Sequence, residues 1–251
     1  SNGTSFAGAT CPGVTTNYWV DLENHGWEGS LTSFPGTPCI VNGSGWNGTG
    51  TAIDPYRVTF DGVDDKIDFA AHQFSQIYTI VAWIRNIGAG VNSNNSAGGS
   101  TAWPVVSKGS LGDELEALDV EFFLGVTPGR NIEGDFENST DSGSNILTSV
   151  GTINDNQWHQ VALVYSHLEG NRYIYIDGAL DNSEAISNIP ADAENARLML
   201  GGQLDQRANN PTGAFNGDIA IVQIYDRALH INEIKSLCTN YMARFNGAVC
   251  N

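Results

Sequence analysis

Two strand-like runs between Asn156 and Gly178 constrain the fold more than any other feature of the sequence. The first, Val161–Tyr165, reads V-A-L-V-Y, and the second, after a polar turn over residues 166–172, reads Y-I-Y-I-D-G. Runs rich in Val, Ile and Tyr on both sides of a Gly/Asn turn are typical of a β-hairpin. Because such a hairpin must bury at least one face, the pattern predicts a sheet packed on a second sheet.

The hairpin also carries a resemblance to a known family. Trp158-His159 enters its first strand and Asp177-Gly178 ends its second, and related segments follow one another along the chain: Phe60–Asp65, Tyr78–Ile84, Val105–Gly109, Phe122–Gly125, Leu200–Gly202 and Phe215–Leu229. Together they resemble laminin-G-like and pentraxin-like domains of the concanavalin A-like lectin/glucanase superfamily. The resemblance implies an all-β fold, a two-sheet antiparallel jelly-roll sandwich with one short C-terminal helix.

We expect residues 1–251 to form one such domain, because sandwiches of this length commonly fold as a unit. Residues 1–50 would supply a first strand and loops, and residues 231–251 a closing helix and tail, with the helix over Ile231–Met242. Val58–Phe69 predicts a hairpin turned at Gly62. His159 is expected to make structural hydrogen bonds.

The four cysteines lie near the two ends of the chain, at Cys11, Cys39, Cys238 and Cys250. Their spacing is not that of a zinc site, and pairing each couple locally is the simplest of the three possible connectivities. Two disulfides would indicate an oxidising compartment. The sequence starts at Ser1 without a leader or a membrane-spanning run, so we expect a mature secreted product.

The net charge of −17 limits the possible partners. Such an acidic surface repels phosphate backbones and anionic headgroups, so neither nucleic acid nor membrane insertion is expected. Cations are the natural partners. The alternative interpretation is that the acidity only keeps a secreted protein soluble.

Acidic residues occupy alternate positions of two neighbouring strand-like segments: Asp119 and Glu121 in the first, and Glu133, Asp135 and Glu137 in the second. If Pro128-Gly129 turns one segment onto the other, residue 121 falls near 135 and residue 119 near 137. Like charges facing each other across strands are destabilising, and water, a basic neighbour or a hard cation relieves them. The basic residues nearby in the sequence are Lys108 and Arg130. Oxygen-rich sites suit calcium. The sequence therefore predicts a calcium site, with a solvated acidic face as the alternative.

The pentraxin resemblance points to the same region. It implies that calcium ligands lie in the loop after Ser107-Lys108-Gly109, at Asp113 and Glu114, and after Leu200-Gly201, at Gln203 and Asp205. Leu204 and Gly213 stand where that family has further polar ligands. One ion is therefore expected in place of two.

Catalysis is not expected. Laminarinase-type glucanases of this broad fold carry Glu-x-Asp-x-Glu, but here Ala117 occupies the position of the first glutamate and Glu116 is displaced by one residue. A shift of one residue places a side chain on the opposite face of a strand. The sequence also lacks Gly-x-Ser-x-Gly, His-Glu-x-x-His and phosphate-loop motifs.

Five aromatic residues are candidates for ligand contact: Trp27, Trp46, Trp103, Tyr173 and Tyr175. Exposed rings would offer flat surfaces for sugars or for a partner protein. Alternatively, the tryptophans cover an end of the sandwich and the tyrosines enter its core.

The resemblance implies a secreted, non-enzymatic module for calcium-assisted recognition of an extracellular glycan or protein, as in adhesion or lectin-like binding. The alternative is a structural subunit of an extracellular filament or coat, in which the polar loops and termini mediate self-assembly.

Overall fold

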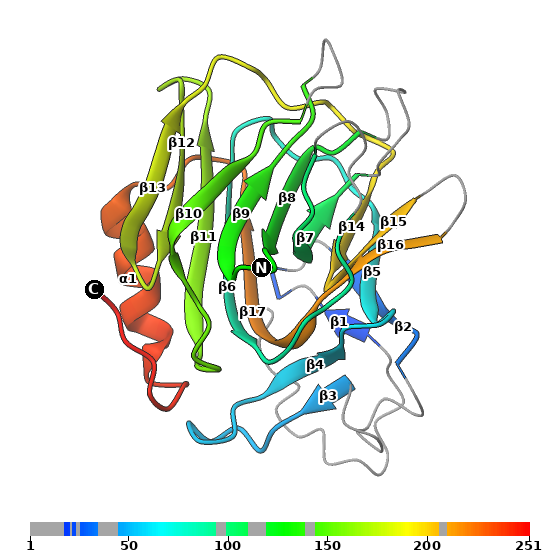
Figure 1. Ribbon diagram of the computed structural model, residues 1–251, viewed down its shortest axis with the longest axis vertical. Helices are drawn as coiled ribbons and strands as arrows, with labels where there is room; N and C mark the ends of the chain where they lie inside the picture. The colour runs from blue at the N-terminus through cyan, green and yellow to red at the C-terminus, as the bar shows by residue number, and fades with distance from the viewer. Residues whose placement is uncertain are drawn as a thin grey trace.

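The computed structural model describes residues 18–20, 22–23, 26–34, 45–93, 99–109, 119–138, 144–205 and 210–251. In these ranges two large antiparallel sheets form a sandwich, and one helix lies beside it (Figure 1). The predicted all-β sandwich with a short C-terminal helix is confirmed.

The eight-stranded sheet has the order β1 (Tyr18–Val20), β2 (Glu28–Thr32), β5 (Lys66–Ala71), β14 (Arg197–Leu200), β7 (Trp103–Lys108), β8 (Phe122–Val126), β9 (Asn131–Asp135), β10 (Leu147–Thr152). The seven-stranded sheet has the order β13 (Ala179–Ala185), β12 (Asn171–Ile176), β11 (His159–Ser166), β6 (Tyr78–Asn86), β17 (Asn216–Tyr225), β4 (Arg57–Asp61), β3 (Gly45–Asn47). A two-stranded sheet joins β15 (Gly202–Asp205) to β16 (Asn210–Ala214).

The predicted hairpin is β11 and β12, paired from Val161↔Ile176 to Ser166↔Asn171. In β11, Val161 and Leu163 face the core between the sheets, whereas Ala162 and Val164 belong to a second apolar cluster beneath the helix. The V-A-L-V-Y run is apolar at every position because β11 is buried on both faces.

Helix α1 (Ile231–Met242) matches the predicted bounds. Its first turn is a capping box, in which the His230 ring accepts a backbone N–H and the Glu233 carboxylate accepts the N–H of His230. Ile234 and Cys238 are buried against the seven-stranded sheet. The predicted Cys238–Cys250 disulfide is confirmed; Cys11 and Cys39 lie outside the described residues.

The hairpin predicted over Val58–Phe69 is wrong. β4 pairs with β17 and β3 in one sheet, while β5 pairs with β2 and β14 in the other, so the turn at Gly62 carries the chain across the sandwich. Alternation does show that Ile67 and Phe69 point into the core. Alternation within a run does not reveal its partner strand. Here β4 and β5 are neighbours in the sequence, but each pairs with strands from distant parts of the chain.

His159 makes the structural hydrogen bonds expected of it. Its Nδ1 lies 2.8 Å from Asp177 Oδ2 and its Nε2 lies 2.9 Å from Asp155 Oδ1. Burial lowers the pKa of His159, but these two carboxylates more than offset that effect, and the pKa is raised above 6.5. The imidazolium form therefore ties the start of β11 to the end of β12.

We predict that His159→Gln lowers the free energy of unfolding mainly under acidic conditions. Because the folded pKa is raised, the stability from the imidazolium is fully present below the unfolded pKa of about 6.5 and is lost as pH rises through the folded value. Urea unfolding on both sides of that window should show a difference of about 1–3 kcal/mol that shrinks with pH. The exposed His167→Gln is the control, and a pH-independent difference would contradict the assignment.

Candidate functional site

The acidic residues of β8, β9 and their flanks lie on the outer face of the eight-stranded sheet. We call Asp119, Glu121, Glu133, Asp135 and Glu137 the acidic row. Their neighbours Phe122, Leu124, Ile132 and Phe136 point the other way, into the core between the sheets. No member of the row is more than 7% exposed. The alternative of a solvated acidic face is therefore wrong.

The register of the row differs from the prediction by two residues. Phe123 pairs with Asp135, which places residue 121 opposite residue 137. In the turn between β8 and β9, Arg130 takes the left-handed conformation, with φ 68°. The five carboxylates still share one face, because a shift of two residues preserves the alternation.

Backbone N–H groups bind two members of the row. Val120 donates to Glu137 Oε2 at 2.8 Å, and Asn145 donates to Asp135 Oδ1 at 2.8 Å. Ser100 donates to the other oxygen of Asp135 at 3.3 Å. Hydrogen bonds of this kind favour the ionised carboxylate.

A lysine is buried beside the row. Lys108 Nζ lies 2.5 Å from Glu121 Oε2, with neither side chain more than 1% exposed, and it also donates to the carbonyl of Ala193. Burial raises the pKa of Glu121 to about 7, although Lys108 acts in the opposite direction. Burial likewise raises the pKa of Glu133, against hydrogen bonds from Ser100 and Thr148. Both glutamates are thus held where a carboxylate charge is costly.

Two oxygens of the row fit a further ligand. Glu121 Oε1 and Glu133 Oε1 are buried and accept no hydrogen bond from the residues that the structure describes. The row does not, however, converge on one point, since within the described ranges no three of its carboxylates are drawn together as closely as those of Asp61, Asp64 and Asp65. A metal near the row would need ligands from another segment.

The other predicted calcium ligands are divided between described and undescribed residues. Asp113, Glu114 and the side chain of Asp205 lie outside the described residues. Gln203 is buried in β15, and its Oε1 accepts a hydrogen bond from Ser93 Oγ at 2.8 Å. The segment 110–118, which contains Asp113 and Glu114, leads directly into Asp119.

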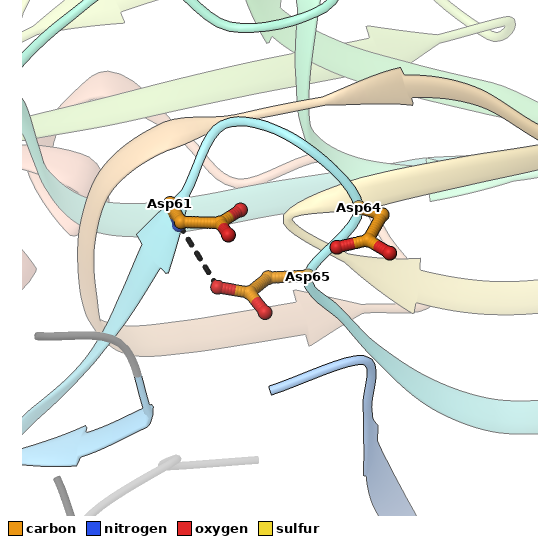
Figure 2. A group of neighbouring side chains, drawn as sticks. All are labelled: Asp61, Asp64 and Asp65. Carbon is orange, nitrogen blue, oxygen red and sulfur yellow. Dashed lines mark hydrogen bonds between the residues drawn. The ribbon is translucent and has the colours of Figure 1, made fainter. Parts of the chain in front are cut away.

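A second acidic group, which the sequence reasoning missed, lies at the turn between β4 and β5. Asp61, Asp64 and Asp65 have carboxylate oxygens within 4.8 Å of one another (Figure 2). Asp65 Oδ2 accepts the N–H of Asp61 at 2.9 Å, and Asp61 Oδ1 accepts the N–H of Val63 at 2.8 Å. These hydrogen bonds stabilise the turn between the two sheets. The carboxylates of Asp61 and Asp65 therefore have a structural role in the turn.

The candidate tryptophans are largely covered. Trp103 is 3% exposed, with the Arg130 guanidinium 4.7 Å from its ring, so it offers no surface for stacking. Trp46 is partly buried and packs 5.3 Å from Trp19. Trp27 is stacked 4.1 Å from His72 and lines a cavity of about 160 Å³ between the sheets.

The candidate tyrosines lie on the outer face of the seven-stranded sheet, since Ile174 between them enters the core. Tyr175 is buried beneath the start of α1, and Tyr173 is partly exposed beside it. Both line a pocket with Glu169 and His230, which the sequence reasoning did not connect to them. The only sequence signal would have been the alternation of Tyr and Ile.

Comparison with known proteins defines the class. The family model Laminin_G_3, concanavalin A-like lectin/glucanases superfamily, matches residues 61–235. The chain belongs to this superfamily. The recognised resemblance is therefore confirmed.

A curated relative from Rattus norvegicus, "Sushi, von Willebrand factor type A, EGF and pentraxin domain-containing protein 1", is 30% identical over 111 residues. That match covers 42% of this chain and 3% of the relative, so the chain spans only a small part of that relative's length.

Two solved structures share the fold. The native heptameric SAP-like pentraxin of Limulus polyphemus has a TM-score of 0.52 at 14% identity, over 77% of this chain and 87% of that one. Domain 4 of AbnA, an extracellular arabinanase from Geobacillus stearothermophilus solved in complex with arabinotriose, has a TM-score of 0.55 at 16% identity, over 84% of this chain and 88% of that one.

Among the described residues of the present chain, α1 is too short and too polar to cross a bilayer.

We predict that Lys108→Met destabilises the protein by about 3 kcal/mol at about pH 8, because it leaves Glu121 buried without its cation. The cost should be smaller at about pH 5, where a glutamate whose folded pKa is raised is protonated in the folded state. Urea unfolding at both pH values measures this, with the exposed Lys235→Met as control. Equal costs at the two pH values would contradict the role of Glu121.

Proposed function

We propose that this chain is an extracellular, non-enzymatic binding module that recognises a glycan or a protein ligand with the help of one calcium ion. Membership of the concanavalin A-like superfamily supports a binding role. The fold is shared with a pentraxin and with a domain solved in complex with arabinotriose, which supports ligand recognition on this scaffold. The Cys238–Cys250 disulfide supports an oxidising, extracellular compartment.

The buried acidic row carries the calcium proposal. Five carboxylates are withdrawn from water on one sheet face, and the buried Lys108 pairs with one of them, Glu121. Burial of several like charges is costly unless a cation compensates them. A calcium ion takes six to eight oxygen ligands and matches this donor set.

The ion is best placed at the end of the row where the backbone of Val120 binds Glu137. Asp119 adjoins Val120 there, and the segment that carries Asp113 and Glu114 precedes Asp119 in the sequence. Glu121 is a weaker candidate because Lys108 already holds one of its oxygens. We propose Asp119 and Glu137, with Asp113 and Glu114, as the ligands.

The proposal assigns no catalysis to these carboxylates. A retaining glycosidase needs one carboxylate as nucleophile and a second as acid/base about 5–5.5 Å away. Glu121 is bound to a buried lysine, and Glu116 and Ala117, at the altered motif, lie outside the described residues. A charge-paired glutamate is poorly suited to exchange protons with a substrate.

The test is thermal unfolding in excess calcium and in excess chelator, on the wild type and on Asp119→Asn. An ion at a hundredfold excess over its Kd stabilises a protein by about 2.7 kcal/mol, so the melting temperature should rise with calcium in the wild type and not in the variant. Asp64→Asn is the matched control, because it removes a carboxylate from the turn between β4 and β5.

Each other outcome has a distinct meaning. A calcium shift lost in Asp64→Asn but kept in Asp119→Asn would move the ion to the turn and overturn the proposed site. The absence of any shift would refute calcium binding. A glycan array probed with and without calcium then tests recognition, and light scattering would reveal self-assembly if the chain is instead a structural subunit.

A further inference from the structure

A pocket of about 420 Å³ lies on the opposite side of the sandwich from the acidic row, between β12, β13 and the start of α1. Its base contains the buried side chains Val164, Tyr175 and Leu229. Its rim holds Tyr173, Leu180 and Ile231, of which Leu180 is 46% and Ile231 38% exposed. This volume lies within the range of small-molecule sites, which are lined mostly by apolar and aromatic groups.

The aromatic part of the pocket is a pair of tyrosines on one strand face. The rings of Tyr173 and Tyr175 are 6.3 Å apart and tilted by 39°, so they form a bent wall and not a parallel stack. Tyr175 is held by the surrounding apolar cluster, whereas Tyr173 keeps part of its ring accessible. A partly exposed ring fixed at its base provides a flat apolar surface at low entropic cost.

Polar groups flank this wall. Tyr173 Oη donates to Glu169 Oε2 at 3.2 Å, which orients the carboxylate beside the ring. The Nδ1 of His230 accepts the N–H of Asn232 at 3.2 Å, so the neutral ring carries its proton on Nε2. The pocket thus combines a hydrogen-bond acceptor, Glu169, with a donor, the Nε2–H of His230.

The electrostatics of the pocket disfavour an anion. The backbone N–H of His230 is taken by the Glu233 carboxylate at 2.9 Å, and the side chain of His230 serves the next turn, so the helix N-terminus is already capped. Arg227, which pairs with Glu233 at 2.6 Å, and the hydrogen bond from His230 hold the pKa of Glu233 at about 2. Glu169 adds a second carboxylate, in a chain of net charge −17.

We propose that this pocket binds one neutral pyranose unit without calcium. The C–H face of the sugar would stack on Tyr173, and its hydroxyl groups would donate to Glu169 and accept from the Nε2–H of His230. The juxtaposition of an accessible ring, an oriented carboxylate and an imidazole donor carries the proposal. This second proposal and the proposed function share only the class of ligand. The position of the pocket and the independence of calcium are argued from the pocket residues alone.

The experiment is an NMR titration of the isotope-labelled chain with methyl pyranosides of glucose, galactose, mannose and xylose, in excess chelator. At least one glycoside should shift the backbone amides of Tyr173, Tyr175 and His230. Tyr173→Ala should weaken that binding by about tenfold or more, and Glu169→Gln should weaken it as well. Tyr173→Phe keeps the ring but removes the hydrogen bond to Glu169, so it should weaken binding less than Tyr173→Ala does. Tyr56→Ala, which changes a half-buried tyrosine outside the pocket, should leave the affinity unchanged.

Three results would overturn the proposal. The first is that no glycoside perturbs these amides. The second is that tetramethylammonium binds the pocket more tightly than every glycoside, which would make it a cation site built from tyrosines and carboxylates. The third is that glycosides bind only when calcium is present, or perturb the acidic row instead, which would support the proposed function alone. Conversely, binding in chelator would stand even if calcium left the melting temperature unchanged.

Discussion

The structure depends on burying both faces of the central strands of the seven-stranded sheet. In β6, Ile80, Ala82 and Ile84 face the eight-stranded sheet, while Val81 and Trp83 face the helix side. Each large apolar side chain buried in this way contributes about 1.5–3 kcal/mol, so exposing the outer face would forfeit much of the folding free energy. Helix α1, the packing of Phe245 on Trp83 at 4.5 Å and the Cys238–Cys250 disulfide therefore complete the core.

This arrangement places the two candidate binding sites on the outer faces of the two sheets. On the eight-stranded sheet, the outward positions of β8 and β9 carry carboxylates, and segments that cross this face cover them; Ser100, in one of these segments, bonds directly to Asp135. On the seven-stranded sheet, the helix packs on the outer face of β6, β11 and β17 and leaves a pocket where its N-terminus meets β12 and β13. One site would be governed by charge compensation and the other by ring stacking and hydrogen bonds, so calcium and pH should act on them differently.

Local patterns predicted several elements well. The β11–β12 hairpin, the bounds of α1 and the Cys238–Cys250 pairing follow from alternation, helical spacing and short sequence separation, all of which are properties of adjacent residues. The register of β8 against β9 could not be predicted in this way. The predicted turn at Pro128-Gly129 implied residue 121 opposite 135, whereas Phe123 pairs with Asp135 and Arg130 takes the left-handed conformation in the turn. The Val58–Phe69 prediction failed because strand partners are chosen by long-range burial.

The sequence by itself determined the class of fold, the shared face of the acidic row and the placement of Tyr173 and Tyr175 on the face opposite Ile174, because strand alternation requires these. The tertiary structure decided that the face of the two tyrosines is the outer one. Only the tertiary structure decided that the acidic row is buried, that Lys108 pairs with Glu121, and that Glu169 and His230 meet the tyrosines. Those features join segments far apart along the chain. Their burial and partners depend on which segments cover a face, and alternation within a single strand carries no information about that.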